Sequence, residues 1–125
     1  TELRNQLGLL VEDLEQVRDA DRIERERMVS RLKEGGFIHD DEPSEEELVL
    51  AMHAYLAASP ALLLAVSLVD VVGEKLPQNL PGTNAEYPNW CVPLHAFNGK
   101  EVLIDDMAHC DRVKRFLTSV DRYIR

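Results

Sequence analysis

Apolar residues recur at three- and four-residue spacing over residues 1–36. This period predicts a pair of amphipathic helices, because residues at that spacing share one helix face. The first stripe spans residues 2–17. The second spans residues 21–33, where Glu and Arg alternate on the opposite face as a solvated surface with weak helix-spaced pairs. Gly35-Gly36 is expected to end the pair. The stripes consist of Leu3, Leu7, Leu10, Leu14 and Val17, followed by Ile23, Met28 and Leu32.

A polar, acidic linker follows over residues 37–44, and Pro43 interrupts it. Ser44 with Glu47 three residues later is the pattern of a capping box, which predicts the start of another helix. The acidic residues 45–47 suit the positive end of that helix dipole. The expected apolar stripe of this helix consists of Leu48, Met52, Tyr55 and Leu56.

Periodicity fails after Ser59-Pro60, because nearly every position there is apolar. A buried strand over residues 62–68 and a buried helix both fit such a run. Together with the preceding helix, this apolar run forms a third segment over residues 45–73. Gly73 and Pro77 then open a long irregular segment over residues 74–97.

The last segment, residues 98–125, begins with Asn98-Gly99, a dipeptide typical of tight turns, next to the β-prone residues 102–104. It should end in an amphipathic helix over about residues 106–124. The chain is therefore predicted to be mainly α, with at most one or two short strands. The apolar stripe expected on the terminal helix consists of Cys110, Val113, Leu117, Val120 and Ile124.

Composition narrows the classes of partner. The chain has 125 residues, 45% of them apolar, which suits one domain with a modest core. It carries 23 acidic and 14 basic side chains, a formal charge of −9, which opposes binding to nucleic acid or to an anionic membrane surface. The longest apolar run is too short to span a bilayer. Cys91 and Cys110 without a signal peptide favour free thiols in the cytoplasm. Because the sequence starts at Thr1 rather than Met, we expect a piece of a longer chain.

Metal and nucleophile chemistry find weak support. His109 and Cys110 are adjacent on a predicted helix and point in different directions, and the chain has no C-x-x-C pair. We therefore predict no metal and no organic cofactor. His39-Asp40 could be read as a catalytic His-Asp pair. It lies in the flexible acidic linker, where nothing is expected to desolvate it and perturb its pKa, so a solvated loop is the better interpretation. The residues of zinc-binding type are Cys91, His95, His109 and Cys110.

The stretch "NLPGTNAEYPNW", residues 79–90, has the most distinctive composition. Its prolines fix backbone angles, and Gly82 permits a turn or the close approach of a ligand. Its asparagines and aromatic rings suit sugar hydroxyls and pyranose faces. Alternatively, the loop is simply rigid and Trp90 anchors it to the core. The residues suited to sugar are Asn79, Asn84, Asn89, Tyr87 and Trp90.

"QNLPGTNAEYPNW" resembles the C-terminal signature loop of bacterial 4-α-glucanotransferases, the amylomaltases or disproportionating enzymes of glycoside hydrolase family 77. Upstream, "SPALLLAVSLVDVVGE" is similar to the family's last barrel strand and the Asp-x-x-Gly turn after it, matched by Asp70 and Gly73. "CVP" at residues 91–93 departs from the basic cluster of many members, so the role of that cluster does not carry over. The matching loop positions are Asn79, Pro81, Gly82, Thr83, Glu86, Tyr87, Asn89 and Trp90.

The resemblance implies the C-terminal part of a cytoplasmic (β/α)8-barrel enzyme that moves α-1,4-glucan segments between maltooligosaccharides by a retaining mechanism. The family's catalytic carboxylates belong to upstream motifs that this chain lacks, and His39-Asp40 is not its Thr-His-Asp-Asn motif. The chain is thus expected to carry no catalytic residue and to be inactive alone. Its expected partners are an α-glucan and the upstream catalytic part of the same enzyme.

A loop after the last strand of such a barrel lies beside the substrate. Asn79 is then the best candidate for a sugar hydrogen bond and Gly82 for close approach, with Pro81 and Trp90 as further substrate-binding candidates. Cut from its barrel, segment 62–68 would bury itself as a helix, against the other helices or against another copy of the chain. The alternative is a free-standing acidic helical interaction module without enzymatic activity, whose partner surface is the Glu/Arg-rich face of residues 21–33.

Overall fold

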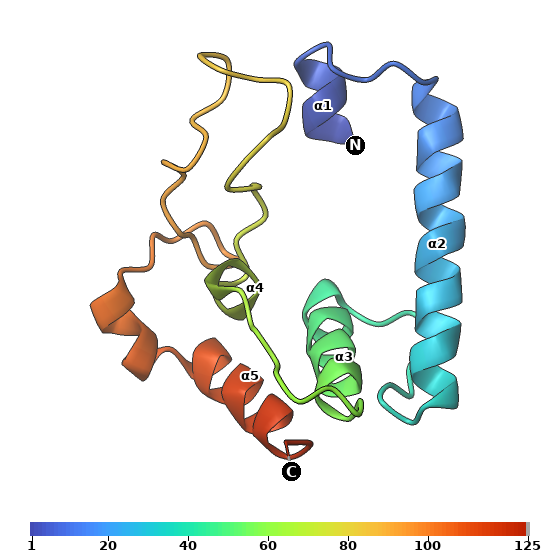
Figure 1. The fold of residues 1–125 in the computed structure, drawn as a ribbon, viewed down its shortest axis with the longest axis vertical. Coiled ribbons are helices and arrows are strands. Elements are labelled where there is room, and N and C mark those ends of the chain that lie inside the picture. Colours follow the sequence, from blue (N-terminus) through green and yellow to red (C-terminus); the bar gives the residue numbers. More distant parts are fainter. Residues whose placement is uncertain (125) are drawn as a thin grey trace.

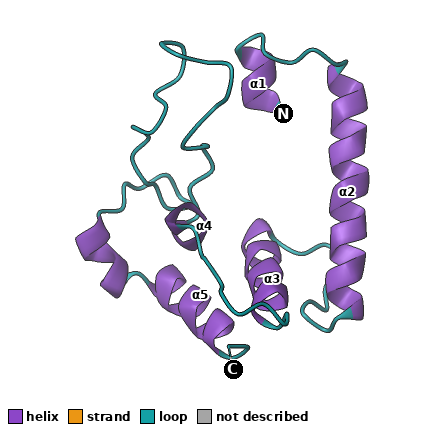
Figure 2. Ribbon diagram, in the orientation of Figure 1, coloured by secondary structure: helices purple, strands orange, loops and turns teal. Residues whose placement is uncertain are grey.

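The computed structural model describes residues 1–124, and within them the fold is helical, as predicted (Figure 2). This part of the chain contains no strand; one isolated antiparallel bridge joins His95 to Glu101. No helix in the described range has the length and apolar character needed to cross a membrane. The elements are α1 (Glu2–Gln6), α2 (Leu14–Glu34), α3 (Glu45–Ala57), α4 (Leu68–Val72), the 3-10 helix η1 (Ile104–His109) and α5 (Asp111–Asp121).

The long helix α2 runs along one side of the molecule, and the irregular segment after α4 rises along the other towards α1 (Figure 1). At the opposite end α5 packs against α3 and α4. Phe116 and Val72 are completely buried there, and they define the main core. The other buried members of this core are Val71, Val113 and Val120.

The expected single helix over residues 2–17 is wrong. Gly8 has a φ of 68°, a left-handed conformation that ends α1, and the chain restarts as α2. Asp13 caps the new start, because its carboxylate accepts hydrogen bonds from the backbone N–H groups of Glu15 and Gln16. The end of α2 at Gly35 is confirmed.

The predicted capping box at the start of α3 is confirmed by reciprocal hydrogen bonds between Ser44 and Glu47. The predicted apolar stripe of this helix is wrong for its last two residues, since Tyr55 and Leu56 are 40% and 49% exposed. The buried residues of α3 are Ala51, His53 and Ala54. They are buried because α3 is covered on two sides, with Leu48 and Met52 near α2 and Val49, Leu50 and Ala57 near α5.

Segment 62–68 is neither the buried strand nor the buried helix that the sequence allows. It is irregular up to α4, and Leu62 and Leu63 are 98% and 91% exposed. Only Leu64 and Val66 pack on the main core. A strand must satisfy its backbone groups through neighbouring strands, and residues 1–124 contain none.

The C-terminal expectations are confirmed in part. The Asn98-Gly99 turn forms, with a φ of 79° at Gly99 and a hydrogen bond from the Ala96 N–H to the Lys100 carbonyl. Instead of a strand over residues 102–104, η1 begins at Ile104. The predicted face of the terminal helix is confirmed at Val113 and Val120, which are buried. However, Phe116 occupies its centre, and Leu117 and Ile124 are 53% and 57% exposed.

Candidate functional site

The irregular segment 74–95 has its own small apolar cluster. Leu80, Tyr87 and Val92 are buried, and Leu3, Leu7 and Leu9 of the N-terminal segment cover them. The Tyr87 hydroxyl donates a hydrogen bond of 2.6 Å to the Pro77 carbonyl. Burial, and then the negative charge of Glu74, raise the pKa of Tyr87. The signature loop, residues 79–90, is therefore attached to the first nine residues of the chain.

Asn89 holds the two sides of the signature loop together from within. Its Oδ1 accepts from the Leu80 N–H at 2.7 Å, and its Nδ2 donates to the Thr83 hydroxyl oxygen at 2.9 Å. That hydroxyl in turn donates to the Leu80 carbonyl at 2.7 Å. Both ends of the Asn89 amide are thus occupied within the loop, so Asn89 does not fit the role of a sugar ligand. Asn79 and Asn84, in contrast, are exposed to solvent.

Pro81 and Gly82 form the exposed tip of a turn between Leu80 and Thr83. Gly82 has a φ of 93°, and the Pro-Gly order with that angle is the pattern of a type II turn. A Cβ at Gly82 would lie in ordinary van der Waals contact with Leu9, at 3.7 Å, so space does not exclude a side chain there. The glycine is required by the backbone conformation of the turn.

Trp90 does not anchor the loop, because the residue is 76% exposed. The anchor is Tyr87, which is 7% exposed. Trp90 has a φ of 63°, and within residues 1–124 no other non-glycine residue has a positive φ. Its backbone N–H donates to the Gln78 carbonyl at 2.6 Å, which fixes this conformation.

The base of segment 74–95 is closed by Glu74, whose side chain is only 4% exposed. Its carboxylate accepts three hydrogen bonds of 2.8 Å, from the Leu76 N–H, the His95 N–H and the His95 Nδ1. Burial opposes ionisation of this carboxyl, but the donors outweigh it and hold the pKa of Glu74 below its ordinary value of 4.5. Sequence reasoning missed this pair, because 21 residues separate the two side chains.

The motif residues Asp70 and Gly73 lie where α4 ends. Gly73 closes the helix with a φ of 87°, and a side chain there would approach the Arg112 Nε to 3.0 Å. Arg112 donates to the carbonyls of Asp70 and Val71 at 3.2 and 3.1 Å. Sequence reasoning also missed Arg112, whose position on α5 gave no signal of this contact.

The buried His53 lies beside this helix end. Its Nδ1 donates to the Val49 carbonyl at 2.8 Å, and its Nε2 lies 3.6 Å from an Asp70 carboxylate oxygen. Its ring packs edge-on against Phe116, with 4.7 Å between the centroids. The cluster joins α3, α4 and α5, so its role is to hold the core together.

The residues of metal-binding type are dispersed. His95 is engaged with Glu74, and the two cysteines are free thiols, Cys91 exposed and Cys110 half-buried. Residues 1–124 contain no cluster of three His, Cys, Asp or Glu side chains with the geometry of a metal site. The Asp40 carboxylate accepts from the Glu42 N–H inside the exposed linker.

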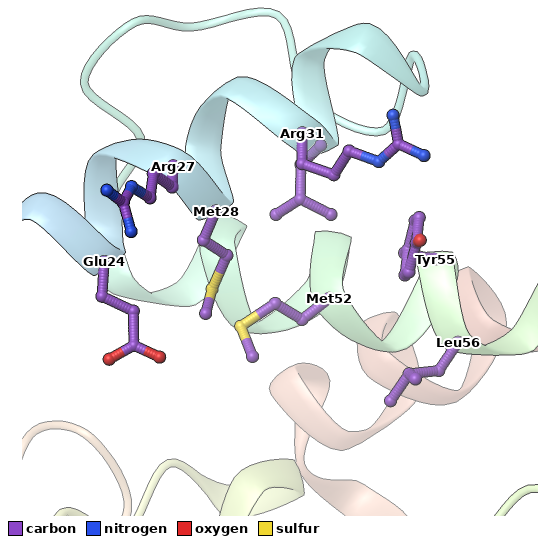
Figure 3. A pocket seen from close by; sticks show the side chains of 8 residues that line it. Glu24, Arg27, Met28, Arg31, Met52, Tyr55 and Leu56 are labelled. Carbon is purple, nitrogen blue, oxygen red and sulfur yellow. The ribbon is translucent and has the colours of Figure 1, made fainter.

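A groove of about 410 Å³ lies between α2 and α3 (Figure 3). Its floor includes the thioethers of Met28 and Met52, and Arg27 stands at its rim. The groove borders the charged face of residues 21–33 and is separate from the signature loop. Its other lining residues are Glu24, Arg31, Leu32, Tyr55 and Leu56.

Comparison with known proteins finds one matching family model, described as 4-alpha-glucanotransferase, over residues 11–98. The 4-alpha-glucanotransferases of Mycobacterium tuberculosis and Mycobacterium bovis are each 43% identical to the chain over 106 residues, or 84% of this chain and 15% of theirs. The 4-alpha-glucanotransferase of Haemophilus influenzae is 34% identical over 104 residues, or 74% of this chain and 14% of its own. The chain thus spans about 15% of the length of these curated relatives. It has no significant match among solved structures.

Proposed function

The chain belongs to the 4-alpha-glucanotransferase family, glycoside hydrolase family 77, and we propose that it is the C-terminal part of such an enzyme. The enzyme transfers α-1,4-glucan segments between maltooligosaccharides in the cytoplasm. In this proposal the chain contributes the signature loop, which lies beside the glucan, and the catalytic carboxylates lie upstream.

The backbone conformation and the exposure of Trp90 are the main support for a sugar-binding role of the loop. A left-handed conformation costs a residue with a Cβ about 1–2 kcal/mol. Trp90 adopts it, and the residue is still 76% exposed to solvent. Such strain in an exposed aromatic residue supports a function, because no burial compensates for it. The indole face is suited to stacking on a pyranose ring.

Asn79, Pro81 and Gly82 complete the proposed sugar surface. Asn79 is exposed, so its amide is free to donate to and accept from glucan hydroxyls. Pro81 and Gly82 form the exposed turn next to it, and the absence of a side chain at Gly82 lets a sugar approach the backbone. The internal hydrogen bonds of Asn89 keep this surface in one shape.

The reaction we propose for the whole enzyme proceeds with retention. One carboxylate attacks the anomeric carbon and forms a glycosyl-enzyme while a second protonates the departing oxygen. The second then removes the proton of the acceptor hydroxyl as the new glycosidic bond forms, and a third carboxylate stabilises the distorted sugar. Because these groups belong to upstream motifs, the isolated chain should not turn over maltotriose. Measurable turnover by the pure chain would refute this assignment.

The missing upstream part is also the proposed partner of segment 62–68. In a barrel this segment would be the last strand, with neighbouring strands on both edges. The exposure of Leu62 and Leu63 supports this, because two adjacent bare leucines are expected where covering elements belong to another part of the protein.

Titration of the chain with maltooligosaccharide tests the loop assignment directly. Trp90 is the only tryptophan, so its emission reports this loop alone. We expect a quenched or shifted emission that saturates with maltooligosaccharide and is absent with an unrelated polyol at the same concentration. Asn79→Ala should weaken binding, whereas Asp41→Asn, in the exposed linker outside the loop, is the control. Equal responses from both variants would contradict the role of Asn79.

A second candidate is an interaction module that acts through the face of residues 21–33. The groove between α2 and α3 favours it, because half-buried methionines and the exposed Tyr55 between charged rims suit a protein contact. This function predicts that maltooligosaccharide leaves Trp90 emission unchanged, so the titration above separates the two candidates.

A further inference from the structure

We propose that Glu74 and His95 form a clasp that fixes the geometry in which the signature loop is presented to its glucan. The two residues are positioning residues rather than catalytic ones. This inference rests on the proposed function of the loop. It holds that a pair outside the signature, the buried Glu74 and the partly buried His95, keeps the signature in shape.

The clasp joins the two ends of the loop segment. Glu74 follows directly on Gly73, which ends α4, and His95 lies 21 residues further along the chain. The Glu74 Oε2 accepts from both the backbone N–H and the ring Nδ1 of His95. Its Oε1 accepts from the Leu76 N–H and so also fixes the start of the segment.

Burial makes this clasp strong. The Glu74 side chain is 4% exposed, and hydrogen bonds to a desolvated carboxylate are stronger than bonds between neutral groups. Its removal would leave the backbone N–H groups of Leu76 and His95 without their acceptor. The His95 N–H is partly buried, so the loss of its acceptor is costly and the local chain would move to reach water.

The surroundings of the clasp connect it to the loop. The charge of Glu74 contributes to the raised pKa of Tyr87, so the carboxylate lies near the side chain that anchors the loop. On the other side, the Lys75 ammonium lies 4.1 Å from the centre of the Phe97 ring and 3.1 Å from a Glu45 carboxylate oxygen. The base is thus held to α3 while the loop extends away from it (Figure 1).

Four variants of the 125-residue chain test the clasp. Glu74→Ala removes the acceptor, and His95→Ala removes the ring donor. His95→Asn keeps an N–H donor at nearly the position of Nδ1, so it is the conservative rescue. Asp41→Asn removes one carboxylate charge from an exposed ion pair with Lys33 in the linker, and it is the matched control.

The first readout is amide hydrogen exchange, which needs no sugar. Glu74→Ala should accelerate exchange at His95 and Leu76 by about tenfold or more, the factor expected when a donor loses a charged acceptor. His95→Ala should show part of this effect, and His95→Asn and Asp41→Asn almost none. Unchanged exchange in Glu74→Ala would overturn the clasp. So would equal acceleration in α3 and α5, since that means a general loss of stability.

The second readout is the maltooligosaccharide titration of Trp90 emission. We expect Glu74→Ala and His95→Ala to raise the Kd by about fivefold or more, with His95→Asn close to the unaltered chain. An unchanged Kd together with fast local exchange would overturn the positioning role. If the unaltered chain shows no sugar response, the loop assignment fails, and hydrogen exchange alone decides whether the clasp holds the loop.

Discussion

The signature loop and the apolar segment before it are opposite in composition and opposite in packing. Residues 79–90 are rich in Asn, Pro and Gly, yet they bury Leu80 and Tyr87 and satisfy their own polar groups through Asn89. Residues 60–67 are almost wholly apolar, yet Leu62 and Leu63 lie bare. Hydrophobicity therefore does not decide burial here.

The difference lies in where each region finds its partners. The loop closes on itself through side-chain hydrogen bonds and on Leu3, Leu7 and Leu9, all within this chain. A strand-like apolar segment has no such local closure, because its backbone and its side chains both need neighbouring elements. The loop is thus held by partners within this chain, whereas the apolar segment leaves Leu62 and Leu63 uncovered.

Replacing a leucine in each region should give the largest difference in the free energy of unfolding. Leu80→Ala should lower the free energy of unfolding by about 2–4 kcal/mol, since it opens a cavity in the loop cluster. Leu63→Ala should change it by less than about 0.5 kcal/mol, because that side chain is already in water. Urea titration followed by circular dichroism measures both. Equal losses would mean that Leu63 is covered in solution, and the comparison would fail.

Replacing each of two asparagines in the loop tests whether the hydrogen bonds of Asn89 stabilise it. Asn89→Ala should cost about 1–3 kcal/mol, because the Leu80 N–H and the Thr83 hydroxyl lose their partner. Asn84→Ala, at an exposed position of the same loop, should cost almost nothing. The unfolding midpoint followed by Trp90 emission separates them, and a similar shift in both variants would show that Asn89 does not hold the loop.

Trp90→Gly tests the strain in the loop. Glycine adopts a φ of 63° without a Cβ penalty, so the variant should be unchanged or more stable by about 1 kcal/mol, although it loses an aromatic side chain. Thermal unfolding followed by circular dichroism measures this, with Trp90→Ala as the control that keeps the Cβ. A clear loss of stability in Trp90→Gly would mean that the indole supports the fold.

Acid should loosen the loop before the core. The pKa of Glu74 in the folded chain is lowered from 4.5, its value in the unfolded chain. The ionised carboxylate therefore stabilises the fold fully at a pH above 4.5. This contribution is lost as the pH falls through the lowered pKa. His95 donates a hydrogen bond to this carboxyl, and the Tyr87 side chain lies near it.

The measurement for this fourth prediction is Trp90 emission against pH, with the far-ultraviolet circular dichroism of the helices recorded in parallel. We expect the emission of Trp90 to change at a higher pH than the helix signal does. Glu74→Gln should remove the separate step. Coincident transitions in both proteins would contradict a local role for Glu74.

Local signals in the sequence determined two helix boundaries and one tight turn. Ser44 with Glu47 specified the start of α3, Gly35 ended α2, and Asn98-Gly99 formed its turn. Each depends on hydrogen bonds or backbone angles within a few residues, which a linear pattern contains. The resemblance of residues 79–90 likewise identified the family.

Tertiary structure decided which faces are buried. Phe116 rather than Leu117 occupies the centre of α5, because α3 and α4 approach from that side. Glu74 finds His95 across 21 residues, and Arg112 reaches the end of α4 across 41. Such contacts depend on how separate elements meet in space, and spacing along the chain carries no measure of that. Family and local turns were therefore determined by the sequence alone, whereas the clasp, the exposed Trp90 and the bare apolar segment were decided by packing.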